Sequence, residues 1–272
     1  MIKFEKTAEE ICFEKFEPDS KIGIIAAVSP EGYPHMSLIS SIMLKDKKTI
    51  MWGQFSQGLS KKYLKENPKS GFAVVSIDQF FWTGKAAHTG SAVKGEDFEW
   101  FNNKPMFRYN SYFGIGVVHY EDIVDISAGE KLPIPKILIG NILSNYAKLF
   151  AGKPEEKELI PKFGVKLAKN LMTLKFISYV DKDGYPRIIP ALQGVPAAGN
   201  RLIFSLAAYP ELLGEIPEGA KTAVFLCSLD LTSVLLQGTF EGVKSYGGAK
   251  CAVFKTEKVY NSMVPVGGYI EN

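Results

Sequence analysis

The sequence is short of several features that would each indicate a class of protein. It has only three cysteines, Cys12, Cys227 and Cys251, far apart and without a CxxC pair, which argues against a disulfide framework and a cysteine-based zinc site. The longest apolar stretch, 134–150, is interrupted by polar residues and is shorter than the ~20 apolar residues of a membrane-spanning helix. Acidic residues stand where a secretory signal would have its apolar core. We therefore expect a cytoplasmic protein without a membrane partner.

An excess of charge of one sign is also missing. Lys and Arg total 32 against 29 Asp and Glu, a net charge of +3, and the lysines are spread along the chain. A nucleic-acid-binding protein concentrates its basic residues on one face, so no nucleic-acid partner is expected. The three histidines lack a metal-ligand spacing, and no metal is expected. We expect His35 and His119 to face solvent and His88 to have a structural role.

An internal repeat organises the residues that are present. SPEGYPH at 29–35 returns as DKDGYPR at 181–187, an offset of 152 residues. At the same offset, TIMWG matches RLIFS, and HTGSA matches LQGTF after a slip of four residues. Near the ends of the copies, 115–127 resembles 251–263, which sets His119 against Lys255.

The repeat predicts two copies of one unit, at roughly 20–127 and 172–263. The composition, 46% apolar and 22% charged, is that of a globular protein. We expect a first domain at 1–130, a helical connector at 131–171 and a second, degenerate domain at 172–272.

Each copy is predicted to be rich in β-strands, because short apolar or alternating runs are separated by turn-forming residues. Helices are expected at 58–68 and 95–103 in the first copy. The second copy keeps a short counterpart of the first helix at 209–219 and lacks the other. Two further helices are expected within 133–171, covering the barrels and joined by a turn at 152–154.

The order of these elements resembles the pyridoxamine 5′-phosphate oxidase-like, FMN-binding split-barrel family. The first copy carries the resemblance over most of its length, through IIAAVSPEGYPHMSLIS, KDKKTIMWGQF, LKENP and FAVVSID. The second copy matches in strand order but not in its ligand motif. The resemblance implies a mainly β fold of two FMN-binding-type split β-barrels, which form an intrachain pseudo-dimer with connecting helices.

The resemblance also implies FMN as the cofactor, with its phosphate at the start of the 58–68 helix. Ser60 takes the family's hydroxyl position. Leu59 stands where the family often has a basic residue, so the cation must come from Lys61, Lys62 or elsewhere. A helix N-terminus stabilises a phosphate through its free N–H groups. The alternative is an ordinary N-cap serine followed by solvated lysines.

Other residues are expected to line the flavin by the same resemblance. Ser40 and Ser41 would lie on the strand that runs beside the ribityl chain and the phosphate. The alternative is that their hydroxyls only form hydrogen bonds with each other. The strand that ends in Trp52, Gly53 and Gln54 would face the flavin ring. Gly53 would allow a ligand to approach closely, and the alternative for Trp52 is a place in the core.

The second copy is predicted to have lost the phosphate pocket and to form a wall beside the first. Arg187 and Gln193 would line this wall near the ring, with surface exposure as the alternative for Arg187. At the offset of 152, four polar residues of the first copy are replaced by leucine: Ser40, Gln54, Ser60 and Lys61 become Leu192, Leu206, Leu212 and Leu213.

The function implied by the resemblance is that of a flavin-dependent oxidoreductase acting on a small molecule. The flavin would carry the chemistry, so no side chain is assigned as catalytic. The alternatives are a non-catalytic flavin carrier or electron-transfer module, and a split barrel that binds haem or a deazaflavin. We expect one FMN per chain and a site that needs no second chain, with further association through the 133–171 helices left open.

Overall fold

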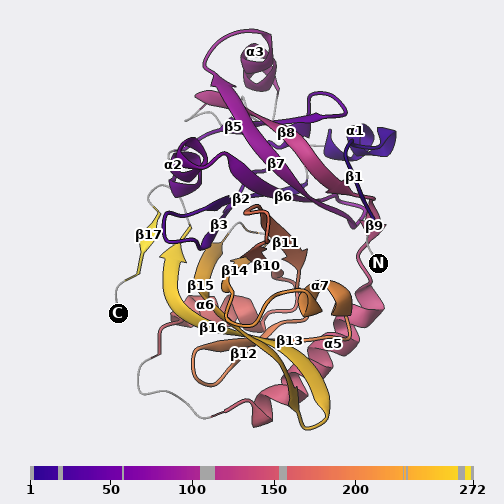
Figure 1. The fold of residues 1–272 in the computed structure, drawn as a ribbon, viewed down its shortest axis with the longest axis vertical. Coiled ribbons are helices and arrows are strands. Elements are labelled where there is room, and N and C mark those ends of the chain that lie inside the picture. The colour runs from indigo at the N-terminus through magenta and orange to yellow at the C-terminus, as the bar shows by residue number, and fades with distance from the viewer. Residues whose placement is uncertain are drawn as a thin grey trace. The chain divides into compact units, whose positions relative to one another are not determined.

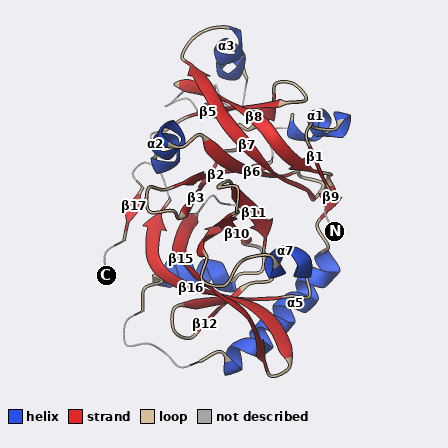
Figure 2. Ribbon diagram, in the orientation of Figure 1, coloured by secondary structure: helices blue, strands red, loops and turns tan. Residues whose placement is uncertain are grey.

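The computed structural model describes residues 3–17, 21–56, 58–104, 114–152, 158–228, 230, 232–262 and 267–270 (Figure 1). Strands dominate these ranges (Figure 2), as the alternating and apolar runs predict. The chain divides into two compact units. Unit 1 comprises Met1–Pro30, His35–Leu132 and Asp181–Arg187, and unit 2 comprises Glu31–Pro34, Pro133–Val180 and Ile188–Asn272.

The first sheet has nine strands, seven of them in the order β3-β2-β6-β7-β8-β5-β4, with β1 paired to β8 and β9 to β7. Three described helices accompany it. The bounds are β1 Phe4–Glu5, α1 Glu10–Phe16, β2 Ile22–Val28, β3 Pro34–Leu38, β4 Met43–Leu44, β5 Thr49–Gln54, α2 Leu59–Glu66, β6 Lys69–Val75, β7 Phe80–Ala92, α3 Glu96–Asn103, β8 Val117–Ser127 and β9 Glu130–Lys131.

The second sheet has eight strands, seven of them in the order β11-β10-β14-β15-β16-β13-β12, with β17 paired to β16. The bounds of the described elements are α5 Ile134–Ala147, the 3₁₀ helix η1 Lys148–Phe150, α6 Lys162–Lys169, β10 Leu174–Val180, β11 Pro186–Pro190, β12 Val195–Ala197, β13 Arg201–Ser205, α7 Pro210–Gly214, β14 Lys221–Cys227, β15 Ser233–Tyr246, β16 Ala249–Asn261 and β17 Gly268–Tyr269.

The two sheets repeat one strand order, β3 to β11, β2 to β10 and so on to β4 and β12. This repetition confirms the predicted duplication and the mainly β, double split-barrel fold. The helices α2 and α3 lie where they are expected, and α7 is the shortened counterpart of α2. Between β15 and β16 only a tight turn remains, at the place that α3 occupies between β7 and β8.

The registers correct two details of the predicted alignment. Lys69 pairs with Ala87 in unit 1, and Lys221 pairs with Thr239 in unit 2, so the offset of 152 continues here without the slip of four residues. Thr49 pairs with Asp122, and Arg201 with Lys255. Lys255 therefore corresponds to Asp122, and the counterpart of His119 is Ala252.

The helices expected within 133–171 are present as α5 and α6, and both contact strands of unit 2. Of the turn expected at 152–154, Lys153 and Pro154 lie outside the described residues. In the ranges that the structure describes, no helix is both long enough and apolar enough to cross a membrane.

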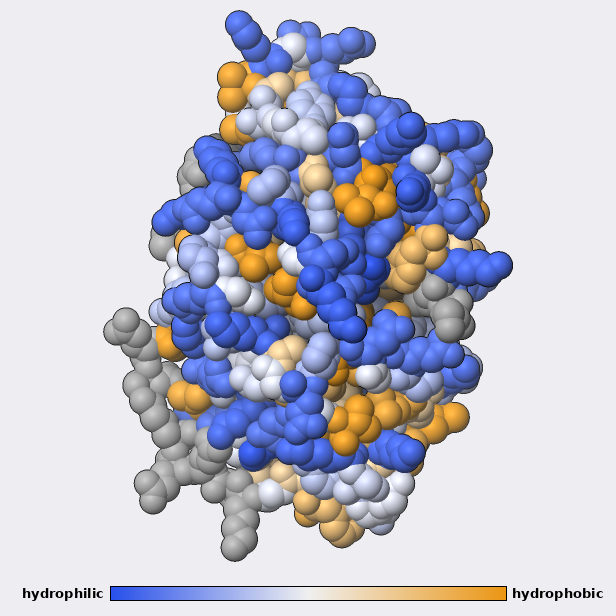
Figure 3. All heavy atoms as spheres, in the orientation of Figure 1, coloured by the Kyte–Doolittle hydropathy of each residue, from blue (hydrophilic) through white to orange (hydrophobic). Residues whose placement is uncertain are grey.

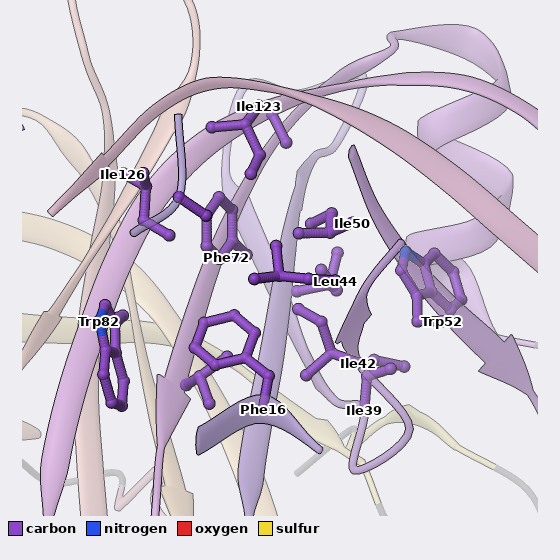
Figure 4. Close-up of a cluster of buried hydrophobic side chains, with 14 of the residues drawn as sticks. Phe16, Ile39, Ile42, Leu44, Ile50, Trp52, Phe72, Trp82, Ile123 and Ile126 are labelled. Atoms are coloured by element: carbon purple, nitrogen blue, oxygen red, sulfur yellow. The ribbon is translucent and has the colours of Figure 1, made fainter. Parts of the chain in front are cut away.

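Helix α2 packs against the hydrophobic core of unit 1. Aromatic side chains from several elements meet inside the barrel, among them Phe16, Phe72 and Trp82 (Figure 4). Tyr63 and Leu64 of α2 join this cluster. The helix ends before Pro68, which disfavours helical geometry at Asn67; Asn67 is accordingly extended, with φ −136° and ψ 107°.

Candidate functional site in unit 1

The first turn of α2 brings polar groups onto a buried surface. Gly58 is the N-cap residue, and no side chain caps the helix, so the first backbone N–H groups receive no acceptor from a capping side chain. Ser60 is 1% exposed, and its hydroxyl lies 2.6 Å from that of Ser37 on β3. Only one of the two hydroxyl hydrogens is used in this bond, which leaves the other to donate to a ligand.

Lys61 is a buried cation at the positive end of this helix. Its side chain lies beside the N-cap, because a Cβ added to Gly58 would be 3.5 Å from Lys61 Nζ. Burial lowers the pKa of Lys61 to about 8. Among the described residues, no carboxylate forms an ion pair with it. A cation is unfavourable at a helix N-terminus and when buried without a counter-ion, so this arrangement favours binding of an anion.

Two buried histidines lie in the same region, and burial lowers the pKa of each. His35 is buried on β3, with its ring edge-to-face with Tyr63 at 5.5 Å, and burial together with the charge of Lys61 lowers its pKa to about 4. His119 is also buried. The expectation that His35 and His119 face solvent is therefore wrong.

His88, His119 and Gln54 form a directed chain of hydrogen bonds. Burial, with contributions from the charges of His88, Lys61 and Lys65, lowers the pKa of His119 to about 3, so its ring is neutral. The Nε2–H of His119 donates to Gln54 Oε1 across 2.8 Å. Its Nδ1 then accepts the Nε2–H of His88 across 3.2 Å. These hydrogen bonds fix the side-chain carbonyl of Gln54 toward His119. The amide N–H₂ group of Gln54 therefore points away from His119.

The buried side chain of Glu121 is connected to this series of hydrogen bonds through Trp52. Trp52 stacks on His119 with ring centroids 4.1 Å apart, and its Nε1–H donates to Glu121 Oε1 across 2.7 Å. The Ser70 hydroxyl donates to the other oxygen of Glu121. Burial raises the pKa of Glu121 to about 7, although both hydrogen bonds oppose the shift. Sequence reasoning missed Ser37, Ser70 and Glu121, because strand pairing alone brings them to this place.

Several of the expected ligand residues have other contacts in the structure. The Ser41 hydroxyl is buried and bonds to the Gly53 peptide, donating to its C=O at 2.8 Å and accepting from its N–H at 3.0 Å. A Cβ on Gly53 would lie 2.2 Å from Ile115 Cδ1. The space that this glycine leaves open is therefore filled by Ile115, which corrects its interpretation as a point of ligand approach. Trp52 belongs to the core, the alternative considered for it.

The other residues expected to bind the flavin do not gather around the first turn of α2. Ser40 is half-buried in the turn after β3, and Lys62 is exposed on the outer side of α2. Arg187, which is part of unit 1, is buried; it forms an ion pair with Asp125 at 2.8 Å and lies over the ring of Phe4. Gln193, in unit 2, is buried and donates to the backbone carbonyls of Ser205 and Ala208.

Unit 2 has apolar residues at most of the corresponding positions. In the α2 counterpart α7, Leu212 and Leu213 are buried. The aligned registers replace Trp52, His88, His119 and Glu121 by Phe204, Phe240, Ala252 and Phe254, all of them buried. Among the described residues, no three His, Cys, Asp or Glu side chains are placed to hold a metal ion.

Comparisons with known proteins find similarity only among solved structures. No family model and no curated protein matches this chain. It is similar to an FMN-binding protein from Syntrophomonas wolfei, at 18% identity and TM-score 0.38, over 44% of this chain and 84% of that one. It is also similar to an F420 reductase, at 15% identity and TM-score 0.36, over 44% and 98%.

A third similar structure is the flavin reductase of the styrene monooxygenase from Pseudomonas putida, at 11% identity and TM-score 0.27, over 41% of this chain and 91% of that one. Each of the three similarities covers a little under half of this chain. The repeated strand order, rather than such distant similarities, establishes the tandem fold.

Proposed function

We propose that unit 1 binds FMN, with the phosphate at the first turn of α2. The observation that carries this proposal is the Lys61 ammonium, which is buried beside the N-cap without a carboxylate partner in the described part of the chain. A phosphate supplies the missing negative charge and accepts hydrogen bonds from a helix N-terminus. A neutral ligand would leave the cation uncompensated.

The residues present fit a phosphate in kind as well as in charge. One hydroxyl hydrogen of the Ser37–Ser60 pair is available to donate, and the first turn of α2 adds uncapped N–H groups. Hydrogen bonds from such donors to an ionised oxygen are among the stronger ones in proteins. We therefore propose for Ser60 and Lys61 the phosphate-binding roles that the resemblance implies, with Ser37 as a further donor.

The flavin ring would be held by groups that present hydrogen-bond donors toward it. Gln54 is the candidate in unit 1, because its carbonyl is engaged by His119 and its amide N–H₂ is directed elsewhere. A bound flavin would supply hydride or electron transfer, and we propose a small-molecule oxidoreductase on that basis. The names of similar proteins, an FMN-binding protein and two reductases, are consistent with this choice.

The phosphate is tested by comparing FMN with riboflavin, which lacks it. Binding of both flavins is measured by calorimetry for the wild-type chain and for Lys61→Met. We expect the wild type to prefer FMN by about 10- to 100-fold, because a hydrogen-bonded charge contributes ~1.5–3 kcal/mol, and we expect Lys61→Met to lose most of this preference. Lys62→Met is the matched control, since Lys62 is exposed. Equal binding of both flavins by the wild type would exclude a phosphate site.

Two further measurements separate the alternatives. Mass spectrometry of the co-purifying small molecule distinguishes FMN from a deazaflavin or haem. Turnover of NADH or NADPH by the flavin-loaded chain is expected for an oxidoreductase. A loaded chain that accepts electrons from a protein donor but not from a nicotinamide would instead be an electron carrier.

A further inference from the structure

Helix α5 has an apolar face that the described residues of unit 2 leave largely exposed. Its inner face, formed by Ile137, Gly140, Ser144 and Ala147, is buried on unit 2 strands that include β13 and β16. An α-helix advances ~100° per residue, which places a second set of large side chains on the opposite face. This outer face consists of Leu138, Ile139, Ile142 and Tyr146, continued in η1 by Leu149 and Phe150, all of them exposed.

The exposure of this outer face is large. Ile142 is 68% exposed and Leu149 is 73% exposed. Figure 3 shows orange spheres over the part of unit 2 where Figure 1 places α5. A surface helix of a globular protein is ordinarily polar on its outer face, and an extended apolar patch of this kind marks an interaction site.

The charges around the outer face are of one sign. By the helical geometry Lys136 lies at one edge of this face and is exposed, whereas Lys148 lies nearer the buried face, is half-buried and donates to Asn145 Oδ1 across 2.7 Å. Residues 132–152 include no acidic residue. A third lysine, Lys250, is exposed in the neighbouring β15–β16 hairpin. The turn of this hairpin lies against the end of the helix, because a Cβ on Gly247 would be 2.9 Å from the side chain of Tyr146.

We propose that the outer face of α5 lies on the surface of an anionic lipid bilayer. A helix whose apolar face is flanked by lysines binds parallel to the membrane, with apolar side chains among the acyl chains and ammonium groups at the anionic headgroups. The sequence argument against a membrane partner concerned a spanning segment, for which this helix is too short. A helix that lies in the interface needs only apolar area and positive charge.

A second copy of the chain fits this face less well. Antiparallel pairing of two α5 helices about Ile142 would bring an exposed Lys136 from each copy beside the seam, and no acid in 132–152 could compensate. The face is also ~20 Å long and one helix wide, which is short of the ~800 Å² per partner that a stable protein interface buries. The observed charges therefore favour lipid over self-association.

The test is flotation of the full-length protein with vesicles of phosphatidylcholine alone or with 30% phosphatidylserine. The wild type is expected to float with the phosphatidylserine vesicles and to be released at high salt, because exposed charges are screened. The double variant Lys136→Gln, Lys250→Gln, at the two exposed lysines beside the face, should bind ~5-fold more weakly for each lysine removed. Ile142→Glu should lose binding, whereas Ile77→Glu, a substitution at an exposed isoleucine of unit 1, should retain it.

Three outcomes would overturn the proposal. The wild type could fail to float with either kind of vesicle. Ile142→Glu and Ile77→Glu could reduce flotation equally, which would show an effect of charge alone. Light scattering could reveal a dimer that Ile142→Glu dissociates, without vesicle binding, which would assign the face to a second copy. None of these results depends on flavin binding, so the proposed function is tested separately.

Discussion

Replacing Lys61 by methionine should stabilise the ligand-free chain while weakening its affinity for FMN. Methionine keeps the length of the side chain and its apolar packing but removes a buried charge. A pKa lowered from 10.5 to about 8 corresponds to ~3 kcal/mol of unfavourable free energy for the charged lysine in the folded state, at ~1.4 kcal/mol per pH unit. We expect Lys61→Met to raise the free energy of unfolding at pH 7 by about 1 to 3 kcal/mol.

The free energy of unfolding of the wild type and of Lys61→Met should also differ in its dependence on pH. Below pH 8, Lys61 is charged in both the folded and the unfolded chain, and its full unfavourable contribution is present. Between pH 8 and 10.5 the unfolded chain binds the extra proton, so the stability of the wild type rises with pH in this window. Lys61→Met should lack this rise. Urea unfolding followed by tryptophan fluorescence reports on unit 1, because Trp52, Trp82 and Trp100 all lie there.

Lys175 in unit 2 provides a matched control. Burial lowers its pKa to about 8 as well, but its ammonium donates to the carbonyls of Asn170 and Leu192 at 3.0 and 2.9 Å. Lys175→Met would leave these acceptors without their donor, so we expect lower stability of unit 2, followed by circular dichroism during urea unfolding, and unchanged FMN affinity. The reasoning about Lys61 is refuted if Lys61→Met lowers the stability of the ligand-free chain and leaves FMN affinity unchanged.

Three other predictions concern the flavin site, the buried Glu121 and the assembly state. Combining Ser60→Ala with Lys61→Ala should lower FMN affinity at least 10-fold in a fluorescence titration, whereas Leu212→Ala at the corresponding place in unit 2 should leave it within about twofold. Glu121→Gln should be more stable than the wild type at pH 8 by up to about 3 kcal/mol in urea unfolding. The pKa of Glu121 is raised from 4.5 to about 7, so the wild type loses stability as pH rises through that window. Equal stability of the two proteins at pH 8 would contradict the buried charge. Light scattering should find flavin on single chains, and loss of flavin whenever dimers dissociate would show that the site needs a second chain.

The repeat could be predicted because its signal is local and recurs in two copies. GYP in a turn is followed in both copies by an apolar strand at the same offset of 152, TIMWG at 49–53 and RLIFS at 201–205. Strands of a repeated unit then pair in the same order. The 58–68 helix was predictable for a similar reason, since Leu59, Tyr63 and Leu64 share one face and Pro68 limits its end. These features depend on residues close together in the sequence.

The arrangement of the polar network could not be predicted, because it depends on pairing between distant strands. The sequence alignment set His119 against Lys255, whereas the register of β5 with β8 sets it beside Trp52. A shift of three residues moves a side chain to the other face of a strand, which is why His119 was expected in solvent. Ser37 was missed for lack of a local signal, while the neighbouring Ser41 proved to bond to the Gly53 peptide.

The asymmetry of the two units is the central claim, and the amount of FMN released per chain tests it most directly. Burying a phosphate against Leu212 and Leu213 without donors would be unfavourable by several kcal/mol, enough to abolish micromolar binding. Protein saturated with FMN, freed of excess ligand and denatured, should therefore release one FMN per chain. Release of two FMN per chain would contradict the account, as would release of one FMN that persists unchanged in the Ser60→Ala, Lys61→Ala variant.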